Sequence, residues 1–282
     1  MTANPIFKTC RREIALGERT LIMGILNVTP DSFSDGGRFF SPALAVEEGL
    51  RLVEEGADML DIGGESTRPG SEPVSREEEL SRVVPVIRAL VNKIGVPISI
   101  DTTKAEVARE AIACGAEIIN DVSAMRFDRE MPGLAADSGA GLVLMHMRGM
   151  PKDMQTGSLH YDSLIDDITA FLRERLQFAL DSGVKSERTL LDPGIGFGKT
   201  VGDNMRLIKH LAHFEMLGRP ILIGVSRKAF IGKVTGGGPQ ERLEGTAAAV
   251  AMAIANGSSV VRVHDVASMK KVVAMTDAII RA

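Results

Sequence analysis

The sequence predicts an α/β protein built as a single (β/α)8 TIM barrel that spans residues 1–282. Three observations lead to this prediction. Eight short apolar runs alternate with longer stretches that suit helices, from one end of the chain to the other. The runs are continuously apolar, as expected of parallel strands that helices cover. No low-complexity linker divides the series, which favours one barrel.

The expected elements follow from local sequence signals. Ser41-Pro42 precedes the first helical stretch, and Ser75 with Glu78 forms a possible capping box before the second. Several helical stretches end at a glycine. Residues 1–19 are expected to be a lead-in. We expect strands at 21–26, 58–62, 97–101, 117–121, 141–147, 188–192, 220–225 and 259–264, and helices at 42–55, 76–93, 104–114, 161–182, 240–256 and 266–281.

A doubly wound open sheet is the structural alternative, because it also alternates strands with helices. The glycine fingerprint of dinucleotide-binding sheets does not follow the first apolar run, where the chain reads NVTPDSFSDGG (27–37). This absence favours the barrel.

Composition excludes several classes of function. The net charge of −4 gives no general reason to expect nucleic-acid or membrane binding. Cys10 and Cys114 lie far apart without metal-ligand spacing, so we expect reduced thiols and a cytoplasmic location. Residues 1–20 contain no apolar core of a secretory signal. The most membrane-like run, 246–255, is about half the length that a spanning helix needs.

Polar residues stand at the C-terminal end of nearly every expected strand. Barrel active sites form at that rim, where the strand ends meet solvent. One polar residue there can simply cap a helix, but the whole set exceeds what capping needs and indicates a site. The residues are Asn27, Gly63-Gly64-Glu65, Asp101, Asn120-Asp121, His146, Asp192, Ser226-Arg227-Lys228 and Arg262-Val263-His264.

Two motifs are weaker than they look. Residues 193–200 read PGIGFGKT, but Pro193 stands where a phosphate-binding P-loop has its first glycine. Lys199 occupies the position of the third glycine of a dinucleotide fingerprint. His210 and His213 have no third ligand in register, so we interpret them as surface residues rather than zinc ligands.

The rim residues divide into two chemical groups. Arg262 and His264 are two residues apart on one strand and share a face. With Ser226-Arg227-Lys228 on the preceding strand end, they are expected to form an anion pocket, where barrels often bind phosphate. On the opposite side of the rim, Asp101, Asn120 and Asp192 suit the donor-rich edge of a flat heterocycle. The sequence therefore predicts a nitrogen-rich ring that carries an anionic leaving group.

At this point the residues resemble a known family, bacterial dihydropteroate synthase. The resemblance covers essentially the whole chain, and its motifs fall in order on the expected strands. They are NVTPDSFSDGG (27–37), DIGGESTRPG (61–70), DTTK (101–104), NDV (120–122), LMHM (144–147), LDPGIGFGK (191–199), GVSRKAFIG (224–232) and VRVHD (261–265).

The resemblance implies a transferase of folate biosynthesis. That family joins 6-hydroxymethyl-7,8-dihydropterin pyrophosphate to p-aminobenzoate and releases pyrophosphate and 7,8-dihydropteroate. Cationic groups and Mg²⁺ would neutralise the departing charge, and Asp101 would stabilise the positive pterin. The arylamine nitrogen would then attack the methylene carbon.

The resemblance also implies a role for each matching residue. Asp101, Asn120, Asp192 and Lys228 would bind the pterin, with Met145 packed on its ring. Arg262 and His264 would bind pyrophosphate. Asn27 would be the Mg²⁺ ligand, and Asp35 a carboxylate that approaches the metal. Thr67, Arg68, Pro69 and Phe197 would form the p-aminobenzoate site.

Two long loops are expected to be mobile parts of this site, at 27–41 and 63–75. A turn needs far fewer residues than the first loop has, so we interpret it as a lid that excludes water from the pterin cation. Ala229 departs from the family, where many members carry a polar residue that helps meet the p-aminobenzoate carboxylate. The second loop carries no insertion, and we therefore hypothesise ordinary sensitivity to sulfonamides.

Two other functions are weighed against this one. A pterin-binding corrinoid methyltransferase barrel would share the Asp and Asn wall, but it has no use for Arg262-x-His264 or Mg²⁺. A catalytically inactive pterin carrier is expected to have lost Asp101, Lys228 or Arg262, and all three are present. The small residues at 247–253 permit close helix contact within or between subunits, and the family resemblance favours a homodimer.

Overall fold

The computed structural model describes residues 5–29, 41–67, 70–150, 154 and 159–282. Three of the predicted site residues, Asp35, Arg68 and Pro69, lie outside these ranges. The same is true of most of the expected first loop.

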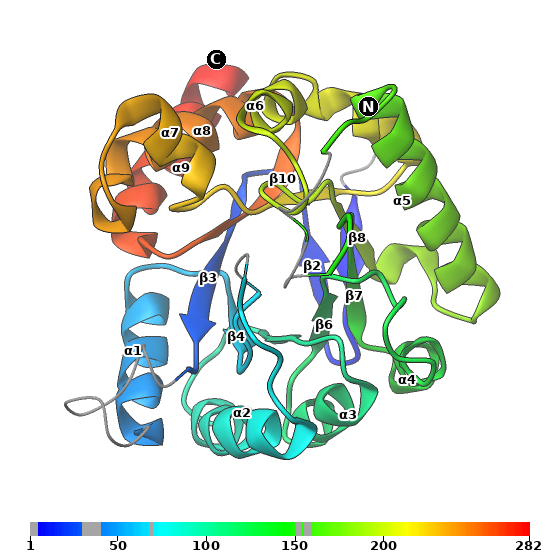
Figure 1. Cartoon of the computed structure of the whole chain (residues 1–282). Helices are drawn as coiled ribbons and strands as arrows, with labels where there is room; N and C mark the ends of the chain where they lie inside the picture. Colours follow the sequence, from blue (N-terminus) through cyan, green and yellow to red (C-terminus); the bar gives the residue numbers. More distant parts are fainter. Residues whose placement is uncertain (1–4, 30–40, 68–69, 151–153, 155–158) are drawn as a thin grey trace.

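The eight predicted strands all form and close into one parallel barrel (Figure 1). The last strand pairs with the first, for example Arg262 with Met23, so the barrel has no open edge. This closure excludes the doubly wound sheet and confirms the TIM barrel. The strands are β3 (Leu21–Asn27), β4 (Met59–Gly63), β5 (Ile98–Asp101), β6 (Ile118–Asp121), β7 (Gly141–Met145), β8 (Thr189–Asp192), β9 (Ile221–Ile223) and β10 (Ser258–Val263).

Helices surround the barrel as a continuous outer layer (Figure 1). The six predicted helices form with small shifts at their ends. Their apolar faces bury residues such as Leu52, Val86 and Leu172 against the strands. They are α1 (Pro42–Glu54), α2 (Arg76–Leu90), α3 (Ala105–Ala113), α5 (Leu164–Asp181), α8 (Leu243–Ala255) and α9 (Val266–Arg281).

Three further helices are not among the ranges predicted as helices. They are α4 (Met131–Ser138), α6 (Val201–Lys209) and α7 (Ala229–Thr235). Helices α4 and α7 span only eight and seven residues, too few for a clear helical period, and α4 contains Pro132 and Gly133. The Thr200 side chain accepts from the Asp203 N–H, and Asp203 caps Thr200 in return, which stabilises the start of α6. In the expected capping box before α2, Ser75 accepts from the Glu78 N–H.

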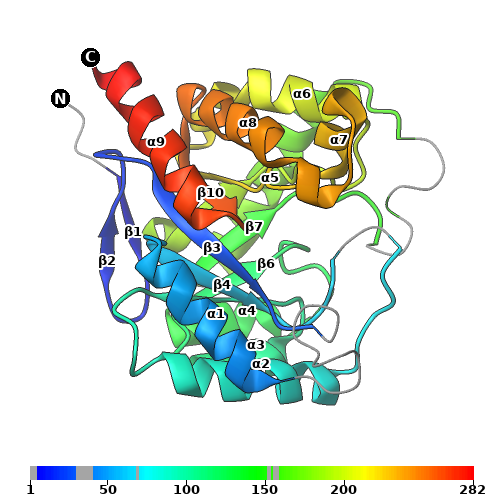
Figure 2. The ribbon, with the colours of Figure 1, turned by 90° about the vertical axis from the view of Figure 1, so that its left-hand side faces the viewer.

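The N-terminal segment forms a hairpin rather than a simple lead-in. Strands β1 (Ile6–Lys8) and β2 (Glu13–Ala15) pair antiparallel and lie against the N-terminal end of the barrel (Figure 2). Phe7 is fully buried there, and a Cβ at Gly141 would lie 2.4 Å from its ring. The hairpin thus closes this end with apolar side chains. The buried cluster consists of Phe7, Leu16, Leu21, Met23, Met59, Ile118, Val143, Leu190, Leu222 and Val260.

The described helices share one further property. None of them is long and apolar enough to cross a membrane.

Candidate active site

The predicted heterocycle-binding residues come together at the C-terminal end of the barrel. Asp101 ends β5, Asn120 lies at the end of β6, and Asp192 ends β8. All three side chains are buried, with 7%, 4% and 5% of their surface exposed. Because parallel strand ends converge at one mouth, residues far apart in sequence come together there. We call this group of buried polar side chains the chamber.

A third carboxylate, Asp61, joins Asp101, Asn120 and Asp192, although it is not among the predicted site residues. Asp61 Oδ2 accepts from Asn120 Nδ2 at 2.9 Å and from Arg262 Nε at 2.6 Å. Its side chain is fully buried in the middle of β4. A signal for it exists in the sequence, since a charged residue interrupts an apolar strand two positions before its end. Buried charges of this kind are rare unless they are paired.

Arg262 reaches across the barrel mouth instead of standing apart from the carboxylates. Its guanidinium bridges Asp61 Oδ2 and Asp101 Oδ2, with Nη2 2.7 Å from the latter. We expected the cationic group and the acidic group to lie on opposite sides of the rim. For Arg262 that expectation is wrong. The long side chain can span from β10 to β4 and β5, and pairing offsets part of the cost of burying three charges.

The expected anion pocket is also smaller than the sequence suggests. Arg227 donates from Nε to Asp265 Oδ2 at 2.9 Å, so its charge is already engaged. Ser226 Oγ lies 3.0 Å from His264 Nδ1 and accepts from the His264 N–H. Burial, reinforced by the positive charge of Arg262, lowers the pKa of His264 to about 3. His264 is therefore neutral at pH 7 and available as a hydrogen-bond donor rather than as a cation.

Asp192 stands beside an apolar floor. Its Oδ1 accepts from the Gly194 N–H at 2.7 Å, and burial raises its pKa to about 6. Met145 is the register partner of Asp192 on β7 and is buried together with Phe197. Lys228 Nζ lies 4.3 Å from the centre of the Phe197 ring, within the range of a cation–π contact. A flat ring could thus pack on Met145 while its polar edge meets Asp192.

The chamber contains buried acceptors that no described residue satisfies. Asp61 Oδ1, Asp101 Oδ1 and Ser99 Oγ have no hydrogen-bond partner among the described residues. Unpaired buried polar atoms are uncommon, because each costs free energy. Burial raises the pKa of Asp101, Arg262 opposes this change and Asp61 reinforces it. The arrangement suits a ligand that supplies N–H donors.

The described parts of the two expected loops are anchored at the same rim. Asn27 ends β3, half-buried beside Gly63 of the neighbouring strand. After Gly63 the chain passes Glu65, which forms an ion pair with Lys104, and reaches the half-buried Thr67. Ala229, the first residue of α7, is exposed.

Within the described ranges, no three His, Cys, Asp or Glu side chains are grouped as a metal site would need. The Asn27 amide oxygen is a hard donor at the barrel mouth. It suits Mg²⁺, which binds few protein ligands and takes the rest of its shell from substrate phosphates and water. The residues described here therefore fit a Mg²⁺ that arrives with a diphosphate.

The two weak motifs are not sites. Lys199 is buried and bonded to His146, so PGIGFGKT does not present its lysine to a phosphate. His210 and His213 are exposed, as expected.

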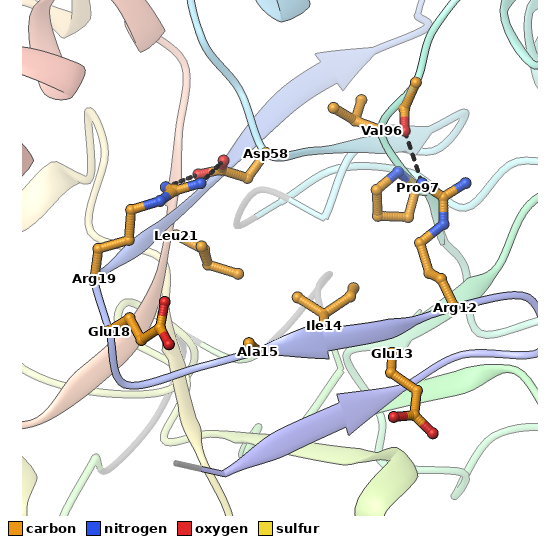
Figure 3. Close-up of a pocket in the computed structure, with 11 residues that line it drawn as sticks. Arg12, Glu13, Ile14, Ala15, Glu18, Arg19, Leu21, Asp58, Val96 and Pro97 are labelled. Carbon is orange, nitrogen blue, oxygen red and sulfur yellow. Dashed lines mark hydrogen bonds and ion pairs between the residues drawn. The ribbon is translucent and has the colours of Figure 1, made fainter.

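A cavity of about 540 Å³ at the opposite end of the barrel is not a better candidate (Figure 3). It lies between the β1–β2 hairpin and the strand starts. Its two arginines are already paired: Arg19 with Asp58 at 2.8 Å, and Arg12 with Glu117 at 2.9 Å. Neither arginine of this cavity is therefore free to recognise an anionic ligand.

Comparison with known proteins agrees with the geometry. A family profile described as "Pterin binding enzyme" matches residues 23–264. The dihydropteroate synthase of Synechocystis sp. is 47% identical over 266 residues, which are 94% of this chain and 92% of that protein.

Solved structures give the same result. The dihydropteroate synthase of Xanthomonas albilineans with 4-aminobenzoic acid has a TM-score of 0.91 at 46% identity and covers 98% of both chains. Its complex with 7,8-dihydropteroate has a TM-score of 0.87 at 43% identity and the same coverage. The Yersinia pestis enzyme in a sulfonamide complex has a TM-score of 0.93 at 40% identity, covering 98% of this chain and 100% of that one.

The barrel, its buried carboxylates and the profile match together define a pterin-binding enzyme. Within that class, the chain belongs to the dihydropteroate synthase family, which matches it over nearly its full length. It is accordingly a transferase of folate biosynthesis.

Proposed function

We propose that this chain condenses 6-hydroxymethyl-7,8-dihydropterin pyrophosphate with p-aminobenzoate, to give 7,8-dihydropteroate and pyrophosphate. The observation that carries the proposal is the chamber of Asp61, Asp101, Asn120 and Asp192 around Arg262, with buried acceptors that need donors. A pterin ring has N–H groups along its edge and would satisfy them. The relatives' complexes with 4-aminobenzoic acid and 7,8-dihydropteroate support the same reaction.

The pterin would lie with its polar edge toward Asp101, Asn120 and Asp192 and with one face on Met145. Lys228 would donate to a ring acceptor from the side of Phe197, next to which it already lies. On binding, ligand donors would reach Asp101 Oδ1, which is buried without a partner among the described residues. Such hydrogen bonds favour the ionised carboxylate, so the pterin would lower the pKa that burial has raised.

The leaving diphosphate would be met by Arg262 and His264 on one face of β10. Loss of diphosphate leaves a cation on the pterin methylene that the ring nitrogens share. Asp101, once ionised, would stabilise that positive charge while Arg262 and Lys228 offset the negative charge that departs. The p-aminobenzoate nitrogen attacks the methylene carbon, forms the C–N bond and then releases its proton.

Mg²⁺ is proposed as the cofactor, held by the Asn27 amide oxygen together with diphosphate oxygens. When bound, it would neutralise part of the diphosphate charge. Asp35, predicted to approach the same ion, lies outside the described residues.

The p-aminobenzoate site is proposed between Phe197 and the second loop, of which Thr67 is described and Arg68 and Pro69 are not. Ala229 offers no side-chain donor, so the carboxylate would depend on Arg68 or on a backbone N–H. A sulfonamide would compete for the same place, as the complex of the Yersinia pestis relative suggests. High-level resistance in a synthase-deficient host carrying this gene would contradict this assignment.

We further propose a homodimer in the cytoplasm. Helix α8 packs between α7 and α9 (Figure 2). These three helices expose Val234, Met252, Met275 and Ile279, each by more than half. Apolar side chains gathered on neighbouring elements are typical of an interface. Met252→Asp should convert a dimer to monomers in sedimentation equilibrium, and a wild-type protein that sediments as a monomer would contradict the proposal.

One experiment tests the reaction itself. The protein is incubated with the pterin pyrophosphate, p-aminobenzoate and Mg²⁺, and both products are quantified. Equal amounts of pyrophosphate and 7,8-dihydropteroate are expected. Absence of product with every divalent cation tried would overturn the proposed reaction.

A further inference from the structure

The loop between β8 and α6, residues 193–200, is tied to the barrel at several backbone groups. The Gly194 N–H donates to Asp192 Oδ1 at 2.7 Å near its start. Near its end, Tyr161 Oη donates to the Gly198 carbonyl at 3.0 Å. Between these two ties stands Phe197, whose ring lies beside Lys228.

Lys199 donates a hydrogen bond to the backbone carbonyl of Phe197 itself. Its Nζ lies 3.1 Å from Phe197 O, 2.9 Å from His146 Nδ1 and 3.4 Å from His146 O. The side chain is only 3% exposed. An ammonium group has three N–H donors, and here it meets three acceptors, none of them a carboxylate. A buried lysine held in this way joins the end of β7 to the aromatic wall after β8.

His146 completes the arrangement from the other side. Burial and then the charge of Lys199 lower the pKa of His146 well below its ordinary value, so its ring is neutral. Nδ1 can accept from Lys199 only if the ring proton sits on Nε2. The ring packs edge-on against Phe171 of α5, with centroids 4.8 Å apart. This packing holds His146 away from the chamber, on the strand face opposite Met145.

The two segments approach so closely that only glycine fits between them. A Cβ at Gly194 would lie 1.9 Å from His146 O, and Gly194 has a φ of +72°. A small displacement of this contact would therefore move Phe197 relative to Lys228. The acceptors proposed for the pterin lie mostly on the barrel strands and would be less affected.

We propose that Lys199 and His146 form a positioning pair, which holds the Phe197 ring beside Lys228 and thereby sets the affinity for p-aminobenzoate. This inference rests on the proposed role of Phe197 as a wall of the p-aminobenzoate site. In this proposal Lys199, the lysine of PGIGFGKT, neither binds phosphate nor contacts a substrate, and it acts through the position of Phe197.

The pair is also expected to respond to pH. Burial, partly offset by Asp192, lowers the pKa of Lys199 to about 7. Below that pH the ammonium serves all three acceptors, whereas above it the neutral amine has only two donors. The affinity for p-aminobenzoate should therefore weaken as pH rises through 7. The charged groups around the pair are Asp192 and Lys228 at neighbouring strand ends, Asp203 on α6, and Arg126 and Arg148 near His146.

Two substitutions separate hydrogen bonding from titration. Lys199→Met keeps the length of the side chain and removes its donors. Lys199→Gln keeps two donors and does not titrate. Lys209→Met, at the exposed end of α6, is the matched control. KM for each substrate and kcat are measured from pH 6 to pH 9.

Lys199→Met should raise KM for p-aminobenzoate by roughly tenfold, the effect of about one lost buried hydrogen bond, with KM for the pterin substrate nearly unchanged. Wild-type KM for p-aminobenzoate should rise above pH 7, and the Lys199→Gln profile should be flat. Equal increases in both KM values would reveal a general structural role and overturn the proposal. A Lys199→Gln profile that still rises like that of the wild type would do the same.

A second measurement needs no turnover. The chain contains no Trp, so Phe197→Trp introduces a single indole, which is excited selectively at wavelengths where the one Tyr does not absorb. Adding Lys199→Met should increase acrylamide quenching of that indole, while adding Lys209→Met should not. Unchanged quenching would refute the positioning role of Lys199 and His146, even if the proposed reaction holds. Conversely, a wild-type protein without synthase activity would refute the reaction and leave the quenching test intact.

Discussion

The two ends of the barrel are built by the same strands with opposite chemistry. At the N-terminal end, β4, β6, β8 and β10 point Met59, Ile118, Leu190 and Val260 into an apolar cluster closed by Phe7. Two residues further along, the same strand faces carry Asp61, Asn120, Asp192 and Arg262. Since side chains alternate along a strand, two residues correspond to one layer of the barrel interior. The change from apolar to polar therefore occurs between two adjacent layers.

This difference shows how the fold separates stability from chemistry. The apolar layer at the N-terminal end, which we call the lower layer, gains stability by removing apolar surface from water. The layer at the C-terminal end, which we call the upper layer, buries charges. It leaves carboxylate oxygens without partners among the described residues, which costs stability unless a ligand is present. Substitutions in the lower layer should therefore affect unfolding, whereas those in the upper layer should affect binding and turnover.

The largest expected effect comes from the lower layer. Phe7→Ala should lower the free energy of unfolding by about 3–5 kcal/mol, because a fully buried aromatic ring is lost beneath the barrel. Chemical denaturation measures this change. Phe7→Leu, which fills most of the space, should cost much less. A change in KM of the folded Phe7→Ala enzyme would show that the two layers are coupled.

In the upper layer, Arg262→Met should lower kcat by about 100- to 1,000-fold, as expected when a group that stabilises transition-state charge is removed. Asp61 and Asp101 would also lose their shared cation, so the variant should be less stable than the wild type. Isothermal titration should show a greater loss of affinity for the pterin pyrophosphate than for the free pterin. Equal losses would contradict the proposed role of Arg262 toward diphosphate.

Asp192 gives a third test, through pH. Its folded-state pKa of about 6 exceeds the ordinary 3.8, so the folded protein holds the proton more tightly. Its favourable contribution is complete below pH 4 and is lost as pH rises through 6. Asp192→Asn should therefore gain about 3 kcal/mol relative to wild type between pH 4 and pH 8, in denaturant titrations. Asp162→Asn, at an exposed carboxylate, is the control, and parallel curves for wild type and Asp192→Asn would contradict this account.

The smallest effect is expected at the rim of the lower cavity (Figure 3). Arg19→Met removes an ion pair with Asp58 from a position where the Arg19 side chain is 57% exposed. The loss should be within about 1 kcal/mol, and salt should reduce it further. Thermal unfolding at low and high ionic strength measures both. A larger, salt-independent loss would show that this end of the barrel also depends on charge.

Much of the site could be predicted because its residues end buried strands. Asp101, Asn120, Asp192 and Arg262 stand at or near those ends, and barrel closure brings strand ends together. Asp61 was harder to recognise because it lies inside a strand rather than after it. Whether an interior charge is functional depends on what faces it across the barrel, and Arg262 is 201 residues away in sequence.

No local sequence pattern predicts certain other features of the structure. The β1–β2 hairpin has strands of three residues, too short for a recognisable alternation. Pro193 already argues from the sequence against a P-loop, but the contact of the buried Lys199 with His146 has no local signal. The roles of Asp35, Arg68 and Pro69 stay predictions, since these residues lie outside the described ranges.

By itself, the sequence determined the order of strands and helices, the closed parallel barrel and the family, because these depend on periodicity and on motifs of neighbouring residues. The tertiary structure decided which charges meet. It joined Arg262 to Asp61 and Asp101, paired Arg227 with Asp265, and placed Lys199 against His146. Pairing between distant residues depends on the reach and burial of side chains across the barrel. Local sequence does not encode those distances.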